Sequence, residues 1–248
     1  MRLFLHELRN QQRLFWRNRE SAVFVFIFPP MLYLLLGAVY TGTSDGFRLA
    51  DVLLVGLIGY GCANTAFAGL AITLVIRRES GVLKRIRATP LPTVTYLAGV
   101  LCSTLVVFVL QTLLTIALGL TLYDATGPKN WAGMIPAVLV GVACFAGMGF
   151  GVTALIRSSE GASAVVNLIV LPMAFLSGSF GPTRNYPEVL QWIADVLPLT
   201  YLIDLMYDVY LRGGSFFGHP KEIAILLAWG LAGVLIAWRR FGWEPRER

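Results

Sequence analysis

The sequence predicts an all-α integral membrane protein with six transmembrane helices. Three observations support this prediction: hydrophobic residues make up 56% of the chain, charged residues make up only 14%, and the charges are confined to short segments between long charge-free runs. A soluble domain carries about 25% charged residues. Since only helices and closed barrels satisfy the backbone inside lipid, we interpret each long run as a helix.

Six runs are candidate spans of one transmembrane domain that covers residues 1–248. A hydrocarbon core about 30 Å thick needs about 20 helical residues. The first five runs are long enough, and the sixth is short unless Lys221 and Arg239 reach towards the interfaces. We interpret the first run as a span rather than a cleaved signal peptide, because a polar segment precedes it and no small-x-small site follows cleanly. The predicted spans are 21–44, 52–76, 93–123, 131–156, 161–181 and 222–238.

Residues 1–20 are predicted to form an amphipathic helix at the membrane interface. Apolar and basic residues recur at helical spacing on two different faces of this segment. Attraction of the arginines to anionic lipid is the simpler interpretation, and both can hold. The apolar set is Leu5, Leu8, Phe15 and Trp16, and the basic set is Arg9, Arg13 and Arg17.

Basic residues alternate in number from one side of the predicted bundle to the other. Of the 20 lysines and arginines, 15 lie in residues 1–20, in the second-to-third and fourth-to-fifth connections, and in the tail with Arg246 and Arg248. The other three connections hold five, Arg184 among them. This positive-inside pattern predicts that both termini are cytoplasmic. The net charge of +6 is therefore a topology signal, and we predict no nucleic-acid partner.

The charge-free runs contain no ionisable aspartate, glutamate, lysine, arginine or histidine. Such a residue near the bilayer centre costs at least about 2.5 kcal/mol and usually marks an ion path or proton relay. Their absence argues against an ion-coupled carrier and against an embedded enzyme. The three cysteines fit packing roles, and we predict no metal site. The polar residues predicted to line a substrate route are Asn64, Gln111 and Asn167.

Small residues recur at four-residue spacing in several runs, as in Gly147/Gly151 and Gly233/Ala237. Small faces let helices approach closely inside a membrane. Two interpretations stay open: static helix packing, and packing that slides during a transport cycle.

The sequence pattern between the fifth and sixth runs predicts a re-entrant helical hairpin on the outer side, over residues 182–214. Pro187 can start a first helix and Pro198 breaks it, and a second helix follows over about 200–211. Each helix is too short and too charged to span. Two interpretations stay open, an outer gate for exported amphiphiles and an interfacial plug. The predicted gate residues are Trp192, Pro198, Tyr201 and Asp204.

The connection 77–92 is basic and predicts a short helix. Ser80 is its candidate N-cap, and Pro90 limits it. Leu83 and Ile86 lie on one side of this helix. A transporter without ion chemistry in its spans would need another source of energy, and the chain has no GxxxxGK[ST] phosphate loop. An ATPase would therefore be another polypeptide, and this connection is the surface that it would contact. Positive-inside charge with lipid contact is the alternative.

The run Arg-Glu-Ser-Gly-Val-Leu-Lys-Arg at 78–85, closing on Thr-Pro-Leu-Pro at 89–92, resembles the intracellular coupling segment of type-2 ABC transporter permeases. The turn Leu-Pro-Leu-Thr-Tyr at 197–201 is similar to the same family. The layout agrees too, so the resemblance covers nearly the whole chain. The residues it marks for coupling are Arg78, Glu79, Gly81, Leu83, Lys84 and Ile86.

The resemblance implies a half-transporter of the bacterial inner membrane: two membrane subunits, identical or paralogous, with two cytosolic ATPase subunits. ATP and Mg would bind the ATPase, and this chain would hold no cofactor and perform no catalysis. It would export a hydrophobic or amphipathic drug, lipid or peptide, as in the similar daunorubicin-resistance permeases. A polysaccharide or glycolipid exporter of the same family, an ion-coupled carrier or channel, and a lipid-modifying enzyme are the alternatives.

Overall fold

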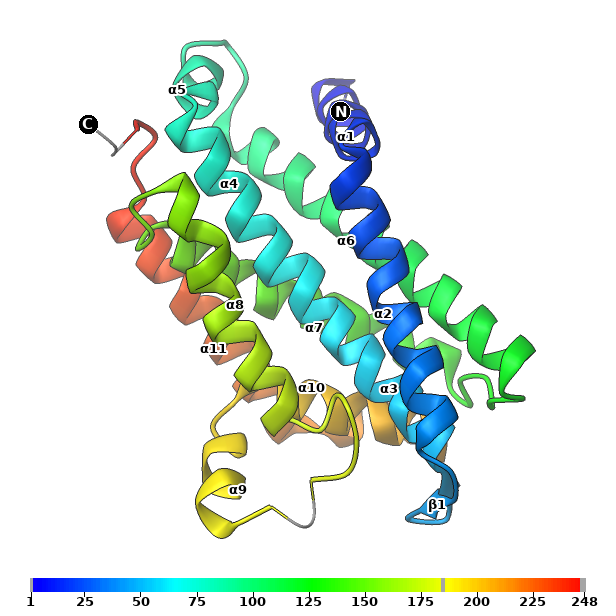
Figure 1. Cartoon of the computed structure of the whole chain (residues 1–248). Coiled ribbons are helices and arrows are strands. Elements are labelled where there is room, and N and C mark those ends of the chain that lie inside the picture. Colours follow the sequence, from blue (N-terminus) through cyan, green and yellow to red (C-terminus); the bar gives the residue numbers. More distant parts are fainter. Residues whose placement is uncertain (1, 184–185, 246–248) are drawn as a thin grey trace.

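The computed structural model describes residues 2–183 and 186–245, so Arg184, Arg246 and Arg248 of the charge pattern lie outside the described residues. Within these residues, six helices are long and apolar enough to cross a membrane, and they pack as one bundle (Figure 1). This confirms the predicted fold class. The six are α2 (Arg19–Val39), the continuous helix α3–η1–α4 (Leu49–Glu79), α6 (Thr93–Leu122), α7 (Trp131–Thr153), α8 (Ser159–Leu176) and α11 (Pro220–Arg240).

The first span is shorter than the run that predicted it. Helix α2 ends at Val39 rather than at 44, and a small antiparallel hairpin of β1 (Thr43–Ser44) and β2 (Phe47–Arg48) follows. Absence of charge does not make a helix here, because Gly42 and Gly46 adopt φ angles of +109° and +80° and turn the chain back.

The last span is longer than its charge-free run, with 21 residues from Pro220 to Arg240. Proline fits the first helical turn, and charged residues at both ends join the helix. The fifth span, predicted to reach 181, ends at Leu176, where Gly178 takes φ +80°. Helices α6 and α7 begin at 93 and 131 as predicted and end at 122 and 153.

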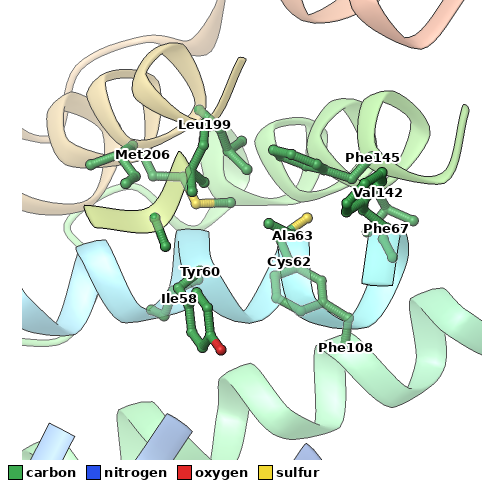
Figure 2. Close-up of a cluster of buried hydrophobic side chains, with 14 of the residues drawn as sticks. Ile58, Tyr60, Cys62, Ala63, Phe67, Phe108, Val142, Phe145, Leu199 and Met206 are labelled. Atoms are coloured by element: carbon green, nitrogen blue, oxygen red, sulfur yellow. The ribbon is translucent and has the colours of Figure 1, made fainter. Parts of the chain in front are cut away.

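The second span is the central helix of the bundle. It is built of α3 (Leu49–Cys62), a π-helical stretch η1 (Ala63–Gly69) and α4 (Leu70–Glu79). Neighbours bury it from several sides: Phe108 of α6, Phe145 of α7 and Leu199 all point towards its side chains (Figure 2). A helix that is apolar all round and covered all round belongs in a core rather than against lipid.

Helices α7 and α11 approach at backbone distance. A Cβ added to Gly147 would lie 2.4 Å from the carbonyl oxygen of Gly230, and one added to Gly151 would lie 2.8 Å from that of Gly233. The predicted small-residue face of the fourth span therefore has its partner in the sixth span, and this pair is tightly interlocked.

Helix α1 (Arg2–Arg17) packs along α6 through polar side chains. Glu7 and Gln11 are its buried residues, and Gln12 Nε2 donates to Ser103 Oγ at 2.9 Å. Leu5 and Trp16 remain exposed. The basic residues Arg9 and Arg13 are exposed as well, and the place of α1 at a membrane interface stays a prediction.

The segment between α8 and α11 forms α9 (Glu188–Ala194), α10 (Pro198–Tyr207), the π-helical turn η2 (Asp208–Arg212) and the 3-10 turn η3 (Phe216–Gly218). The axes of α9 and of α10 with η2 meet at 83°, so the pair is a right-angled bend rather than a hairpin with antiparallel arms. Pro187 precedes α9 instead of starting it, and Pro198 begins α10. Leu199, Leu202 and Met206 bury α10 in the main core. Figure 1 shows α9 and β1 at the end of the bundle opposite α5 (Val82–Arg87) and the two termini.

Candidate functional site

The connection between the second and third spans forms a sharp elbow at the α5 end of the bundle. Helix α4 closes with the amide of Ser80 donating to the carbonyl of Ile76 at 2.9 Å, and Gly81 follows with φ +72°. This is a left-handed helix stop that glycine adopts without steric cost. Ser80, predicted to cap the start of the short helix, instead ends α4, and Gly81 is the residue that precedes α5.

A fully buried arginine fixes this elbow to the fourth span. The Arg78 guanidinium donates to the carbonyl of Thr153 at 2.8 Å and to that of Ile156 at 2.6 Å. Its Nε donates to Oε1 of Glu79 at 2.6 Å. The planar fork of arginine suits three acceptors in fixed directions, which a lysine ammonium does not match. Arg78 therefore connects the end of α4 to the end of α7.

The charge of Arg78 is balanced within the chain. Glu79, whose side chain is only 4% exposed, supplies the opposite charge. The carbonyl groups at the end of α7 add the negative end of a helix dipole. Sequence reasoning placed both residues at an ATPase contact; in the structure their side chains face inward, and their part in coupling stays a prediction.

Helix α5 has one face on the chain and one face in solvent. Leu83 is fully buried in a small apolar cluster with Leu74, Tyr96 and Phe150, and Ile86 packs against its edge. Leu83 is thus an anchor for α5. The side chains that reach outward are Val82, Lys84, Arg85 and Arg87.

The chain's tail completes this cluster, which sequence reasoning missed. Phe241 and Trp243 pack against the Leu83 cluster, and Glu244 Oε1 lies 3.3 Å from Lys84 Nζ. The only sequence signal was an aromatic pair directly after a span, which usually indicates an interfacial belt.

Helix α1 is tied to the same elbow by a polar chain. Arg77 donates to Gln11 Oε1 at 2.8 Å and to the hydroxyl of Tyr96 at 3.0 Å. Gln11 in turn donates to Glu7. We define the coupling module as the end of α4, the whole of α5, and the parts of α1, α6, α7 and the tail that contact them.

The three predicted route residues do not meet. Gln111 of α6 is buried, and its Oε1 accepts from the hydroxyl of Thr65 at 2.8 Å in the π-helical stretch. Asn64 is buried next to Thr65 on that stretch, whereas Asn167 is exposed on α8. Gly61 makes the close approach possible, since an added Cβ would lie 2.4 Å from Gln111 Nε2.

The predicted gate residues lie in two environments. Trp192 of α9 is 74% exposed, whereas Pro198 is buried. The Tyr201 hydroxyl donates to the carbonyl of Asp195 at 2.6 Å and braces the bend. The carboxyl of Asp204 on α10 is partly desolvated; this, followed by the charges of Glu222 and Asp195, raises its pKa to about 6.

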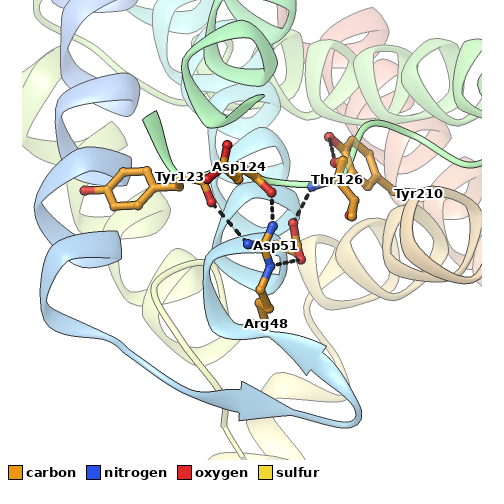
Figure 3. Close-up of polar contacts among 6 residues, drawn as sticks. All are labelled: Arg48, Asp51, Tyr123, Asp124, Thr126 and Tyr210. Carbon is orange, nitrogen blue, oxygen red and sulfur yellow. Dashed lines mark hydrogen bonds and ion pairs between the residues drawn. The ribbon is translucent and has the colours of Figure 1, made fainter. Parts of the chain in front are cut away.

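A polar cluster that sequence reasoning did not single out closes the bundle near the β hairpin (Figure 3). Asp51, only 3% exposed, accepts from the amide of Thr126 at 2.7 Å and pairs with Arg48 Nε at 3.3 Å. Arg48 also donates to the carbonyl of Asp124, and the Tyr210 hydroxyl donates to that of Thr126 at 3.0 Å. These bonds join the second span, the third-to-fourth connection and η2. An Arg–Asp pair three residues apart was visible in the sequence, but its distant partners were not.

Comparisons with known proteins cover most of the chain. The family model described as ABC-2 type transporter matches residues 2–211. A Bacillus subtilis transport permease, YvfS, is 26% identical over 223 residues, 89% of each chain. The Escherichia coli inner membrane transport permease YhhJ is 32% identical over 113 residues, 44% of this chain and 30% of its own length. Nodulation protein J of Rhizobium leguminosarum is 36% identical over 100 residues, 39% of this chain and 36% of its own.

Proposed function

The chain belongs to the ABC-2 type transporter family, and we propose that it serves in an exporter that moves a hydrophobic or amphipathic substrate outward. It is an ABC transporter membrane subunit and a multi-pass membrane protein, and its family consists of transport permeases rather than enzymes. The proposal adds the direction, the substrate class, a bacterial inner-membrane location, and two copies of a separate ATPase that bind ATP and Mg.

The construction of the coupling module is the observation that carries this proposal. Helix α5 presents Arg85 and Arg87 outward and is anchored inward by Leu83. A force on its exposed face therefore passes into α4 through the elbow at Gly81. Because Arg78 joins the ends of α4 and α7, both spans would move together when the ATPase binds and hydrolyses ATP.

The arrangement of the ends supports a cytoplasmic place for this module. Figure 1 shows α5 at the same end as the N-terminus, the start of α8 and the C-terminal tail. These are the segments that carry most of the basic residues. Under the positive-inside rule, that end faces the cytoplasm, where an ATPase would be available.

The character of the spans supports an apolar cargo and an external energy source. Among the described residues, the charged side chains of the six spans lie in their terminal turns, as Asp51 and Glu160 do. The hydrogen-bonded pair Gln111–Thr65 is buried within the chain, whereas Asn167 is exposed on α8. We place the route between this chain and a second copy or a paralogue, with Asn167 on its wall.

The test targets the exposed face of α5. Arg85→Glu and Arg87→Glu together should lower co-purification of a co-expressed ABC ATPase about tenfold or more, because buried charge pairs at an interface are worth several kcal/mol. Arg13→Glu is the matched control, since it reverses an exposed arginine on α1 at the same end. Equal loss in the control, or none in the double variant, would refute the contact.

A transport measurement separates this function from the ion-coupled alternative. Proteoliposomes that hold the chain with its ATPase should accumulate a fluorescent amphiphile only with ATP. Accumulation by the chain alone, driven by a proton or sodium gradient, would reject the exporter. Product formed from lipid by the chain alone would instead support a lipid-modifying enzyme.

A further inference from the structure

A groove opens beside the turn between α7 and α8, next to the coupling module, with which it shares Ile156. It has a volume of about 270 Å³ and runs between Val152 at the end of α7 and Ile169 on α8. Its walls are aliphatic, and Val165 and Ile169 are 42% and 37% exposed. Exposed aliphatic side chains that line a hollow favour an apolar occupant.

One charged side chain lines this groove, at the end where the chain turns. Arg157 is exposed there, next to Ser158, whose hydroxyl accepts from the amide of Gly161 at 3.1 Å and caps α8. The other nearby cation, Arg78, is buried behind Ile156 and engaged by Glu79. Arg157 is therefore the cation that a molecule in the groove would meet.

The position of the groove specifies the medium it opens to. The start of α8 lies at the same end as α5 and the termini (Figure 1), which the proposed orientation places at the cytoplasmic interface. From Arg157 the groove continues along α8 towards the middle of the span at Ile169. A molecule with one charged end at the interface and an apolar chain in the inner leaflet matches this course.

We infer that this groove binds an anionic phospholipid of the inner leaflet, with its phosphate at Arg157 and an acyl chain between α7 and α8. A guanidinium forms paired hydrogen bonds with phosphate oxygens. A choline cation on the same lipid headgroup would weaken the attraction between the phosphate and Arg157. Since Arg157 is the one charged side chain in the groove's lining, it matches a headgroup with a single negative charge, as in phosphatidylglycerol. The inference uses the proposed orientation but not the identity of any exported substrate.

The experiment compares two lipids with the same acyl chains on the purified full chain. Native mass spectrometry would count bound phosphatidylglycerol and phosphatidylcholine during a titration from detergent. We expect phosphatidylglycerol to bind more tightly, and Arg157→Gln to weaken it about tenfold, the usual scale for a lost charge-assisted hydrogen bond. Phosphatidylcholine binding should hardly change in that variant.

Two further variants test the groove itself. Val165→Trp fills the space between the helices and should weaken both lipids without altering charge. Arg13→Gln removes an exposed cation at the same end, away from the groove, and should change phosphatidylglycerol binding less than twofold. A melting curve for each variant checks that it is folded. Equal binding of the two lipids, or unchanged phosphatidylglycerol binding in Arg157→Gln or Val165→Trp, would overturn the inference.

Discussion

The buried arginine of the coupling module offers the sharpest test of how this bundle is held together. Arg78→Met replaces the guanidinium with an apolar side chain of similar length. It removes the donors for the carbonyls of Thr153 and Ile156 and leaves the carboxylate of Glu79 in a nearly buried place. The ends of α4 and α7 then lose the polar connection that joins them.

The expected loss follows from those three contacts. Breaking a buried charge pair by removing one partner costs about 3–5 kcal/mol, and an orphaned carbonyl adds part of about 1–3 kcal/mol. For a chain of this size, 1 kcal/mol corresponds to about 2–4 °C in melting temperature, so the broken charge pair alone should lower it by about 6–20 °C, and the orphaned carbonyls add to that fall. Adding Glu79→Gln should restore part of it, because the orphaned charge disappears.

Buried cysteines make the assay simple. Cys62 and Cys144 are buried and become available to a thiol-reactive fluorescent dye when the bundle opens. The matched control is Arg85→Met, which removes an exposed arginine from α5 seven residues away. The reasoning is wrong if Arg78→Met melts within about 2 °C of Arg85→Met.

Three further predictions use the same melting assay. Leu83→Asp should destabilise the chain by about 3 kcal/mol or more, because it buries an unpaired charge, while Val82→Asp on the exposed side of α5 should not. Gly233→Ala should separate α7 from α11 and lower the melting temperature, whereas Gly218→Ala, which meets no atom within 4 Å, should leave it unchanged. Asp204→Asn should raise the melting temperature at pH 7.5 but not at pH 4. The pKa of the Asp204 carboxyl is raised to about 6 in the folded chain, so the stability that is present below the unfolded pKa is lost as the pH rises through 6. An amide does not ionise and therefore avoids that loss.

The fold class was predictable because lipid imposes a simple rule. A span must be about 20 apolar residues, so charge-free runs revealed six helices and their approximate places. The rule fails at the ends, where local backbone geometry decides. The first helix ends at Val39, where Tyr40 takes an extended conformation, and Pro220 starts the last helix before its charge-free run.

The connection 77–92 was predictable as a helical segment but not residue by residue. Its composition and motif located an elbow at 77–92, and a helix is there. Which side chains face out depends on what packs beneath the elbow. Arg78 reads as a surface cation in a basic loop, yet the end of α7 covers it. The contact of Trp243 with this cluster follows from no local pattern.

The sequence by itself determined that this chain belongs in a lipid bilayer. Apolar runs alternate with basic loops, which indicates a membrane bundle with a basic end, because the free energy of transfer into lipid follows from the composition of each run. Tertiary structure decided which charges are used internally. Arg78 and Asp51 are satisfied by backbone groups more than 70 residues away, as at Thr153 and Thr126. Such hydrogen bonds depend on direction and distance in three dimensions, and a linear pattern holds neither.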